Sequence, residues 1–166
     1  MPYPVMLVNW PGHALVVGGG AVALRKTSGL AAAGIPVRVV SPDFVAGFTD
    51  LPSVSLVPAR YRAGHLRGAT LVFACTNDRA VNRRVGLAAR TRGLPVLVAD
   101  APEESTFLSP AVTHVGGVVA AISTGGASPA LAASIRDAIR GVLDDAGRPD
   151  LPALRKRRAT RRAASS

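Results

Sequence analysis

Apolar residues near the start of the chain follow strand spacing, then helix spacing, then strand spacing again. After His13 the apolar run ALVV ends in three glycines, and AVALRKTSGLAAAG then sets large apolar residues among alanines, as a helix ended by Gly34 would. PVRVVSPD predicts a second strand at about 36–40. Together they predict a strand, helix, strand unit of the length that dinucleotide-binding folds use.

The same alternation continues up to Asp100. SVSLVPARY, around 53–59, predicts a weaker strand whose proline favours a sheet edge, and ATLVFACT (69–76) predicts a strong one. The segment 78–93 predicts a helix with Asp78 near its start, followed by a strand in LPVLVAD (94–100). We therefore expect an α/β fold, a Rossmann-type parallel sheet with strand order 3-2-1-4-5.

Beyond Asp100 the pattern changes. SPAVTHVGGVVAAISTGG holds two apolar stretches separated by the turn-prone Gly116-Gly117, which predicts a C-terminal β-hairpin. SPALAASIRDAIRGVLDD predicts a helix with Ser128 at the N-cap, Pro129 at its first position and an apolar stripe of Leu131, Ile135, Ile139 and Leu143. A hairpin and an amphipathic helix outside a complete sheet indicate a dimerisation element, so we expect a homodimer.

The charge divides the chain further. Of the formal +10, residues 148–166 contribute +6, with seven of the 20 Lys and Arg and one acid. This segment has no sustained apolar period, which favours a basic, disordered tail; an arm that contacts DNA or RNA is the alternative. We thus expect an NAD-binding Rossmann domain over 1–112, a dimerisation and substrate element over 113–147, and the tail over 148–166.

Composition excludes several classes of protein. With 48% hydrophobic and 4% aromatic residues the chain should fold. No apolar run approaches the roughly 18 to 20 residues of a membrane span, and the N-terminus lacks the features of a signal peptide, so we expect a cytoplasmic protein without membrane contact. The single cysteine, Cys75, cannot form an internal disulfide, and three scattered histidines do not have zinc-site spacing, so we expect no resident metal.

The glycines after the first strand fit the G-x-G-x-x-G/A pattern of dinucleotide sites. Gly18 would make the tight turn, Gly20 would admit a pyrophosphate to the backbone, and the helix N-terminus would offer free N–H groups. Asp43 follows Gly20 by 23 residues, where an acid accepts hydrogen bonds from the ribose and favours NAD over NADP. Arg38, as a possible partner of a 2′-phosphate, would instead favour NADP. The alternative for the turn itself is that it packs without a ligand. The expected contacts with NAD are Gly18, Gly19, Gly20, Ala21, Val22, Pro42 and Asp43.

With these pieces placed, the chain resembles the precorrin-2 dehydrogenase family, which includes the N-terminal module of sirohaem synthases. The motifs that carry the resemblance are VVGGGAVALRK, VVSPD, ACTND with VNRRV, VADAPEESTFLSPA and AISTGGASPALA, in order over about residues 3–145. The resemblance implies NAD-dependent oxidation of precorrin-2 to sirohydrochlorin. Some members also insert Fe²⁺, which would then be a substrate, although no His or Cys cluster here supports that activity.

In that family an aspartate at the position of Asp100 is implicated in catalysis. Asp100 also ends the fifth strand, at the edge where open α/β sheets bind ligands, so it is our candidate general base; a loop-forming Asp before Ala-Pro is the alternative. Thr76 and Asn77 leave the fourth strand at the same edge and are candidates for contacts with the cofactor, or only part of a helix cap.

An acidic tetrapyrrole needs cationic or N–H partners. The segment that opens the last helix is a plausible anion cradle for its carboxylates, with ordinary N-capping as the compatible alternative. The candidate substrate residues are Ser123, Thr124, Gly125, Gly126, Ser128 and, on the hairpin, His114. The competing functions are a non-enzymatic NAD-binding regulator, disfavoured because no nucleic-acid reading helix is recognisable, and a catalytically impaired relative without the helices that close the pocket.

Overall fold

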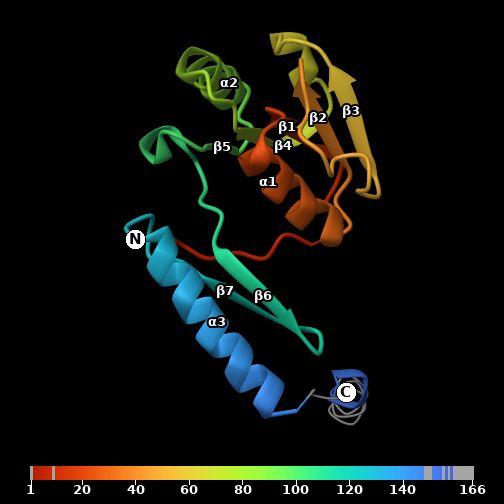
Figure 1. Cartoon of the computed structure of the whole chain (residues 1–166), viewed down its shortest axis with the longest axis vertical. Helices are drawn as coiled ribbons and strands as arrows, with labels where there is room; N and C mark the ends of the chain where they lie inside the picture. The colour runs from red at the N-terminus through yellow and green to blue at the C-terminus, as the bar shows by residue number, and fades with distance from the viewer. Residues whose placement is uncertain (1, 9, 148–150, 155, 157, 159–166) are drawn as a thin grey trace, which may run out of the picture. The chain divides into compact units, whose positions relative to one another are not determined.

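The computed structural model describes residues 2–8, 10–147, 151–154, 156 and 158. These form two compact units, one over Tyr3–Leu108 and one from Ser109 onward, and each is considered by itself. Figure 1 shows the helices and strands of both. None of the helices in the described part of the chain is long and apolar enough to cross a membrane.

The unit Tyr3–Leu108 is a five-stranded parallel sheet with the order β3-β2-β1-β4-β5, as the sequence predicted. Its strands are β1 (His13–Val17), β2 (Val37–Ser41), β3 (Val54–Pro58), β4 (Ala69–Ala74) and β5 (Val96–Val98). Its helices are α1 (Ala21–Ala32), α2 (Arg79–Thr91) and the 3-10 turns η1 (Ala63–Leu66) and η2 (Pro102–Glu104). The strand with the proline, β3, is at the edge, because Pro58 cannot donate to a neighbour.

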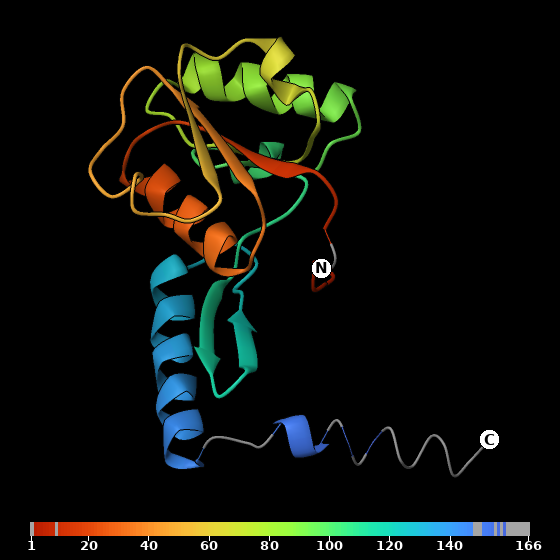
Figure 2. The ribbon, with the colours of Figure 1, turned by 90° about the vertical axis from the view of Figure 1, so that its right-hand side faces the viewer.

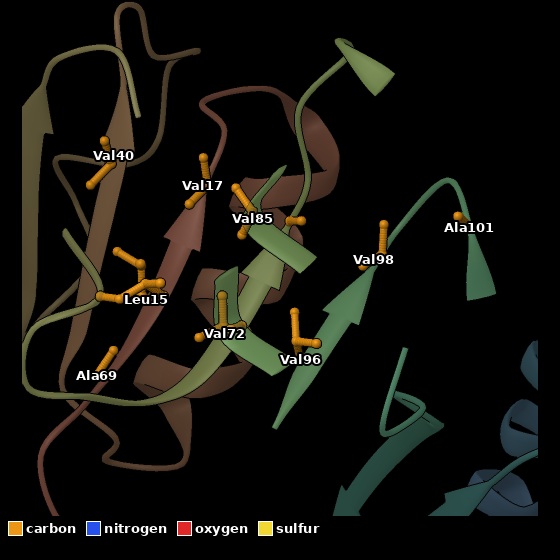
Figure 3. Packing of buried hydrophobic residues seen from close by; sticks show 12 residues of the cluster. Leu15, Val17, Val40, Ala69, Val72, Val85, Val96, Val98 and Ala101 are labelled. Atoms are coloured by element: carbon orange, nitrogen blue, oxygen red, sulfur yellow. The ribbon is translucent and has the colours of Figure 1, made fainter. Parts of the chain in front are cut away.

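Two apolar layers hold this sheet. One layer lies on the side of α2 and contains Val17, Val72, Val85 and Val98, each exposed by 2% or less (Figure 3). The other contains Ala23 of α1 together with Val16 and Phe73 from the strands. Since the strands are buried on both faces, their sequences are continuous apolar runs rather than alternating ones.

The second unit is built from the antiparallel hairpin of β6 (Ala111–Val115) and β7 (Val118–Ile122) and the helix α3 (Pro129–Asp145). The helix runs alongside the hairpin (Figure 2). Ser128 is its N-cap and accepts a hydrogen bond from the Leu131 N–H, at 3.2 Å, as predicted. The first half of the expected apolar stripe, Leu131 and Ile135, is exposed.

The expected tail, 148–166, lies mostly outside the described residues. Residues 151–154 form a helical turn, and the Leu151 side chain lies against Gly117 at the tip of the hairpin. The division between the two units falls between Leu108 and Ser109.

Candidate cofactor site

The carboxyl ends of β1, β4 and β5 meet along one edge of the sheet. The Cys75 N–H donates to the Val17 carbonyl (2.8 Å), and the Ala99 N–H donates to the Ala74 carbonyl (2.9 Å). The glycine turn after β1, the turn after β4 and the segment after β5 therefore leave the sheet side by side. This is the edge where open α/β sheets bind ligands.

The first two glycines of the turn are required by close backbone packing. Gly18 has φ +128°, and a Cβ there would lie 2.4 Å from the Cys75 carbonyl oxygen. A Cβ on Gly19 would lie 1.9 Å from the Asp43 carbonyl oxygen, and the Gly19 carbonyl accepts from the Val45 N–H (2.8 Å). The turn is thus pressed between the segments that follow β4 and β2, and a side chain fits at neither position.

Gly20 is different, because no atom lies within 4 Å of where its Cβ would be. Gly20 is the N-cap of α1, has no side chain to cap the helix, and is followed by exposed Ala21 and Val22. The first turn of α1 contains no acid. Free N–H groups, the positive end of the helix dipole and open space above Gly20 make a cradle that fits a pyrophosphate. The geometry fits a dinucleotide, and Gly18, Gly19, Gly20, Ala21 and Val22 surround the cradle.

Asp43 and Pro42 follow β2 and are both exposed. The Asp43 carboxylate has no hydrogen bond or ion pair among the residues that the structure describes. The Asp43 backbone packs on Gly19, so this residue lies next to the glycine turn. It is therefore placed to accept hydrogen bonds from a ribose of a nucleotide held by that turn.

Thr76 and Asn77 have different roles in the turn after β4. The Thr76 hydroxyl is engaged within the turn, where it contacts Asn82 (2.8 Å) and accepts from the Asp78 N–H (3.1 Å). The Asp78 carboxylate caps α2 through the N–H groups of Ala80 and Val81. Asn77 is exposed, and its side chain has no hydrogen-bond partner in the described parts of the chain. Of these residues, Asn77 has the freer side chain to contact a cofactor.

Asp100 lies two residues beyond β5 and is exposed. Its carboxylate makes no hydrogen bond or ion pair with any described residue. It lies within electrostatic range of the Cys75 thiol, whose pKa is raised to about 11, chiefly by burial and slightly by the charge of Asp100. Cys75 is therefore a protonated thiol at neutral pH.

The loop before α3 uses its hydroxyls internally. The Ser123 hydroxyl accepts from the Gly125 N–H (3.2 Å), and the Thr124 hydroxyl accepts from the Ser128 N–H (2.9 Å). Gly125 and Gly126 have positive φ and open space around them. His114 is exposed on β6. The N–H groups of Gly125 and Ser128 are used in the same bonds, so this loop pairs many of its polar groups internally.

Asn82 was not singled out from the sequence. It is fully buried on α2 and makes three hydrogen bonds to Thr76. The signal was available, because an amide on the helix face shared with Val85 and Ala89 must find partners inside the protein.

The remaining candidates for a site are a cavity away from this edge and a metal centre. A cavity of about 400 Å³ lies beside η1, lined by Ala63, Gly64, Leu66, Arg67 and Arg92. Within the described residues no group of three or more His, Cys, Asp or Glu could hold a metal ion.

Comparisons with known proteins agree with the fold and the glycine turn. A family model described as "Putative NAD(P)-binding" matches residues 10–111, and one described as "Sirohaem biosynthesis protein central" matches residues 121–141. The chain is similar to a solved structure of SirC, a precorrin-2 dehydrogenase, with TM-score 0.73 and 29% identity over 84% of this chain and 70% of that one.

Curated relatives are longer. The siroheme synthase of Nitrosomonas eutropha is 41% identical over 145 residues, which are 85% of this chain and 30% of that protein. The siroheme synthase of Methylococcus capsulatus is 42% identical over 128 residues, 75% of this chain and 27% of that protein. The chain thus spans about 30% of the length of these relatives.

Proposed function

The chain belongs to the NAD(P)-binding family whose model matches residues 10–111, and on that premise we propose that it oxidises precorrin-2 to sirohydrochlorin with NAD in sirohaem biosynthesis. One observation carries the proposal: the open cradle at Gly20 and the free carboxylate of Asp100 follow strands that end at the same edge of the sheet. The similarity to SirC and to siroheme synthases supplies the substrate.

The reaction removes one hydride and one proton from the tetrapyrrole. NAD held in the glycine cradle would supply the acceptor for the hydride. Asp100 takes the proton as general base, since it is exposed, unpaired among the described residues and held next to a rigid strand end. Asp43 favours NAD, because its carboxylate repels the 2′-phosphate of NADP and accepts hydrogen bonds from a free ribose. We place this reaction in the cytoplasm.

The loop before α3 supplies substrate contacts in this proposal. Gly125 and Gly126 have open space around them just before α3, which leaves room for a carboxylate of an acidic tetrapyrrole at the positive end of the helix dipole. His114 adds a further polar group on the hairpin.

We also propose that the hairpin and α3 form a homodimer. Large apolar side chains on these elements remain exposed: Val112, Val119, Leu131, Ile135 and Val142. A second copy that covers these side chains would remove their apolar surface from water, which favours association.

The test is anaerobic incubation of the protein with precorrin-2 and NAD, in which NADH and sirohydrochlorin are followed together. We expect one NADH per sirohydrochlorin. Asp100→Asn should keep its affinity for NAD and lose turnover by about 10² to 10⁴-fold, the usual contribution of a positioned base. Glu103→Gln, an exposed neighbouring acid, is the matched control and should turn over normally.

Two results would contradict the proposed reaction or the proposed role of Asp100, respectively. NAD binding without sirohydrochlorin would indicate a regulator or an impaired relative. Normal turnover by Asp100→Asn would remove that residue from the mechanism while leaving the dehydrogenase intact.

A further inference from the structure

Asn82 binds both backbone polar groups of one residue, Thr76. It is fully buried on α2, and its amide oxygen accepts from the Thr76 N–H (3.0 Å) while its amide nitrogen donates to the Thr76 carbonyl (2.9 Å). The same amide oxygen contacts the Thr76 hydroxyl at 2.8 Å. A buried amide is stabilising only where its groups are paired, so Asn82 fits this turn and would be costly elsewhere in the core.

The residue that Asn82 holds lies against the glycine turn. A Cβ on Gly18 would lie 3.1 Å from the Thr76 nitrogen and 2.4 Å from the Cys75 carbonyl oxygen. The backbone of the β4–α2 turn is therefore in direct contact with the first glycine of the cofactor cradle. The two turns that face the candidate cofactor site form one packed block, and Asn82 fixes it from inside the protein.

We propose that Asn82 is a positioning residue for the dinucleotide. It acts through Thr76, which it locks between β4 and the start of α2, and so sets where the exposed Asn77 side chain and the glycine turn stand relative to each other. The inference rests on the proposed binding of NAD. A rigid, pre-formed site of this kind lowers the ordering cost of binding, so loosening it should weaken affinity for the cofactor.

The experiment compares variants of one helix by two readouts, the dissociation constant for NAD and the urea midpoint of unfolding. Asn82→Ala removes all three contacts. Val85→Ala is the matched control, because Val85 is fully buried on the same helix and belongs to the core, and its apolar side chain can make no hydrogen bond to the turn. We expect Asn82→Ala to raise the Kd for NAD about tenfold or more and Val85→Ala to change it less than about twofold, even where both lose similar stability.

Asn82→Asp is the second variant and keeps the side-chain shape. Its carboxylate can still accept from the Thr76 N–H, but only the protonated form can donate to the Thr76 carbonyl. Its affinity for NAD should therefore improve, relative to the unmodified protein at the same pH, as the pH is lowered through the pKa of that carboxyl. This variant also provides the comparison if Asn82→Ala does not fold.

The outcomes separate the two proposals. Unchanged Kd for NAD in a folded Asn82 variant, or equal loss of affinity in Val85→Ala, would overturn the positioning role and leave the dehydrogenase standing. Failure of the unmodified protein to bind NAD would overturn both.

Discussion

The sheet with its helices and the hairpin with α3 bury their apolar residues to very different extents. In the sheet, Val16, Val39 and Val72 have no exposed surface at all. In the hairpin and α3, few residues are buried, while Leu131 is 52% and Val142 67% exposed. The sheet therefore has a core of its own, and the hairpin with α3 has an apolar surface that suits a partner.

The largest expected effect is in the sheet, at Gly19. Gly19→Ala would place a methyl group 1.9 Å from the Asp43 carbonyl oxygen, a contact that only a backbone shift could relieve. We expect a loss of roughly 3 kcal/mol or more in the free energy of unfolding, together with loss of NAD binding. Urea unfolding and calorimetric titration with NAD measure the two effects.

Gly20→Ala is the matched change one residue later. No atom lies near its Cβ, and the Gly20 φ of −87° suits any residue, so the fold should be unaffected. The methyl group would enter the cradle instead and weaken NAD binding about tenfold or more. If Gly20→Ala bound NAD normally, the pyrophosphate would not lie over Gly20.

The next effect concerns the exposed face of α3. Leu131→Asp with Ile135→Asp would bury two unpaired carboxylates in the proposed dimer, and should raise its dissociation constant about a hundredfold or more. Light scattering across a concentration series measures the change. Leu87→Asp, at an exposed leucine of α2, is the control and should leave the oligomeric state unchanged. A monomeric unmodified protein would contradict the dimer itself.

A smaller effect is expected inside the second unit, at Thr113. Its side chain is buried, and its hydroxyl has no hydrogen-bond partner among the described residues. Thr113→Val keeps the shape, suits a strand and removes the unsatisfied group, so it should stabilise the protein by about 1 kcal/mol in urea unfolding. A destabilised variant would mean that the hydroxyl finds a partner in the assembled protein.

The sequence was sufficient for the sheet because its signals are local. Apolar runs, the glycines and the proline of β3 predicted five strands, their order and the edge strand, all of which the structure confirms. The helix caps at Asp78 and Ser128 were also predicted from the sequence, because a cap depends on residues only a few positions apart. The family resemblance is confirmed by the comparisons.

What the sequence could not supply is long-range packing. The need for glycine at position 19 comes from the Asp43 backbone, which follows a different strand of the sheet. The pattern of α3 predicted one apolar stripe, yet its N-terminal half is exposed. Periodicity identifies which residues share a face and does not say what covers that face.

The smallest expected effect is a pH dependence that arises at the opposite edge of the sheet, at the start of β1. Burial, and then the charge of Arg38, lower the pKa of His13, and its Nε2 has no partner among the described residues. Below the unfolded pKa of about 6.5 the unfolded chain binds a proton that the folded protein disfavours, so stability should fall as pH drops from that value toward the folded pKa and stay level above it. Urea midpoints at about pH 7.5 and 5.5 measure this loss, which His13→Gln should reduce and His114→Gln, at an exposed histidine of the hairpin, should not. An equal acid loss in His13→Gln would place the titrating group elsewhere.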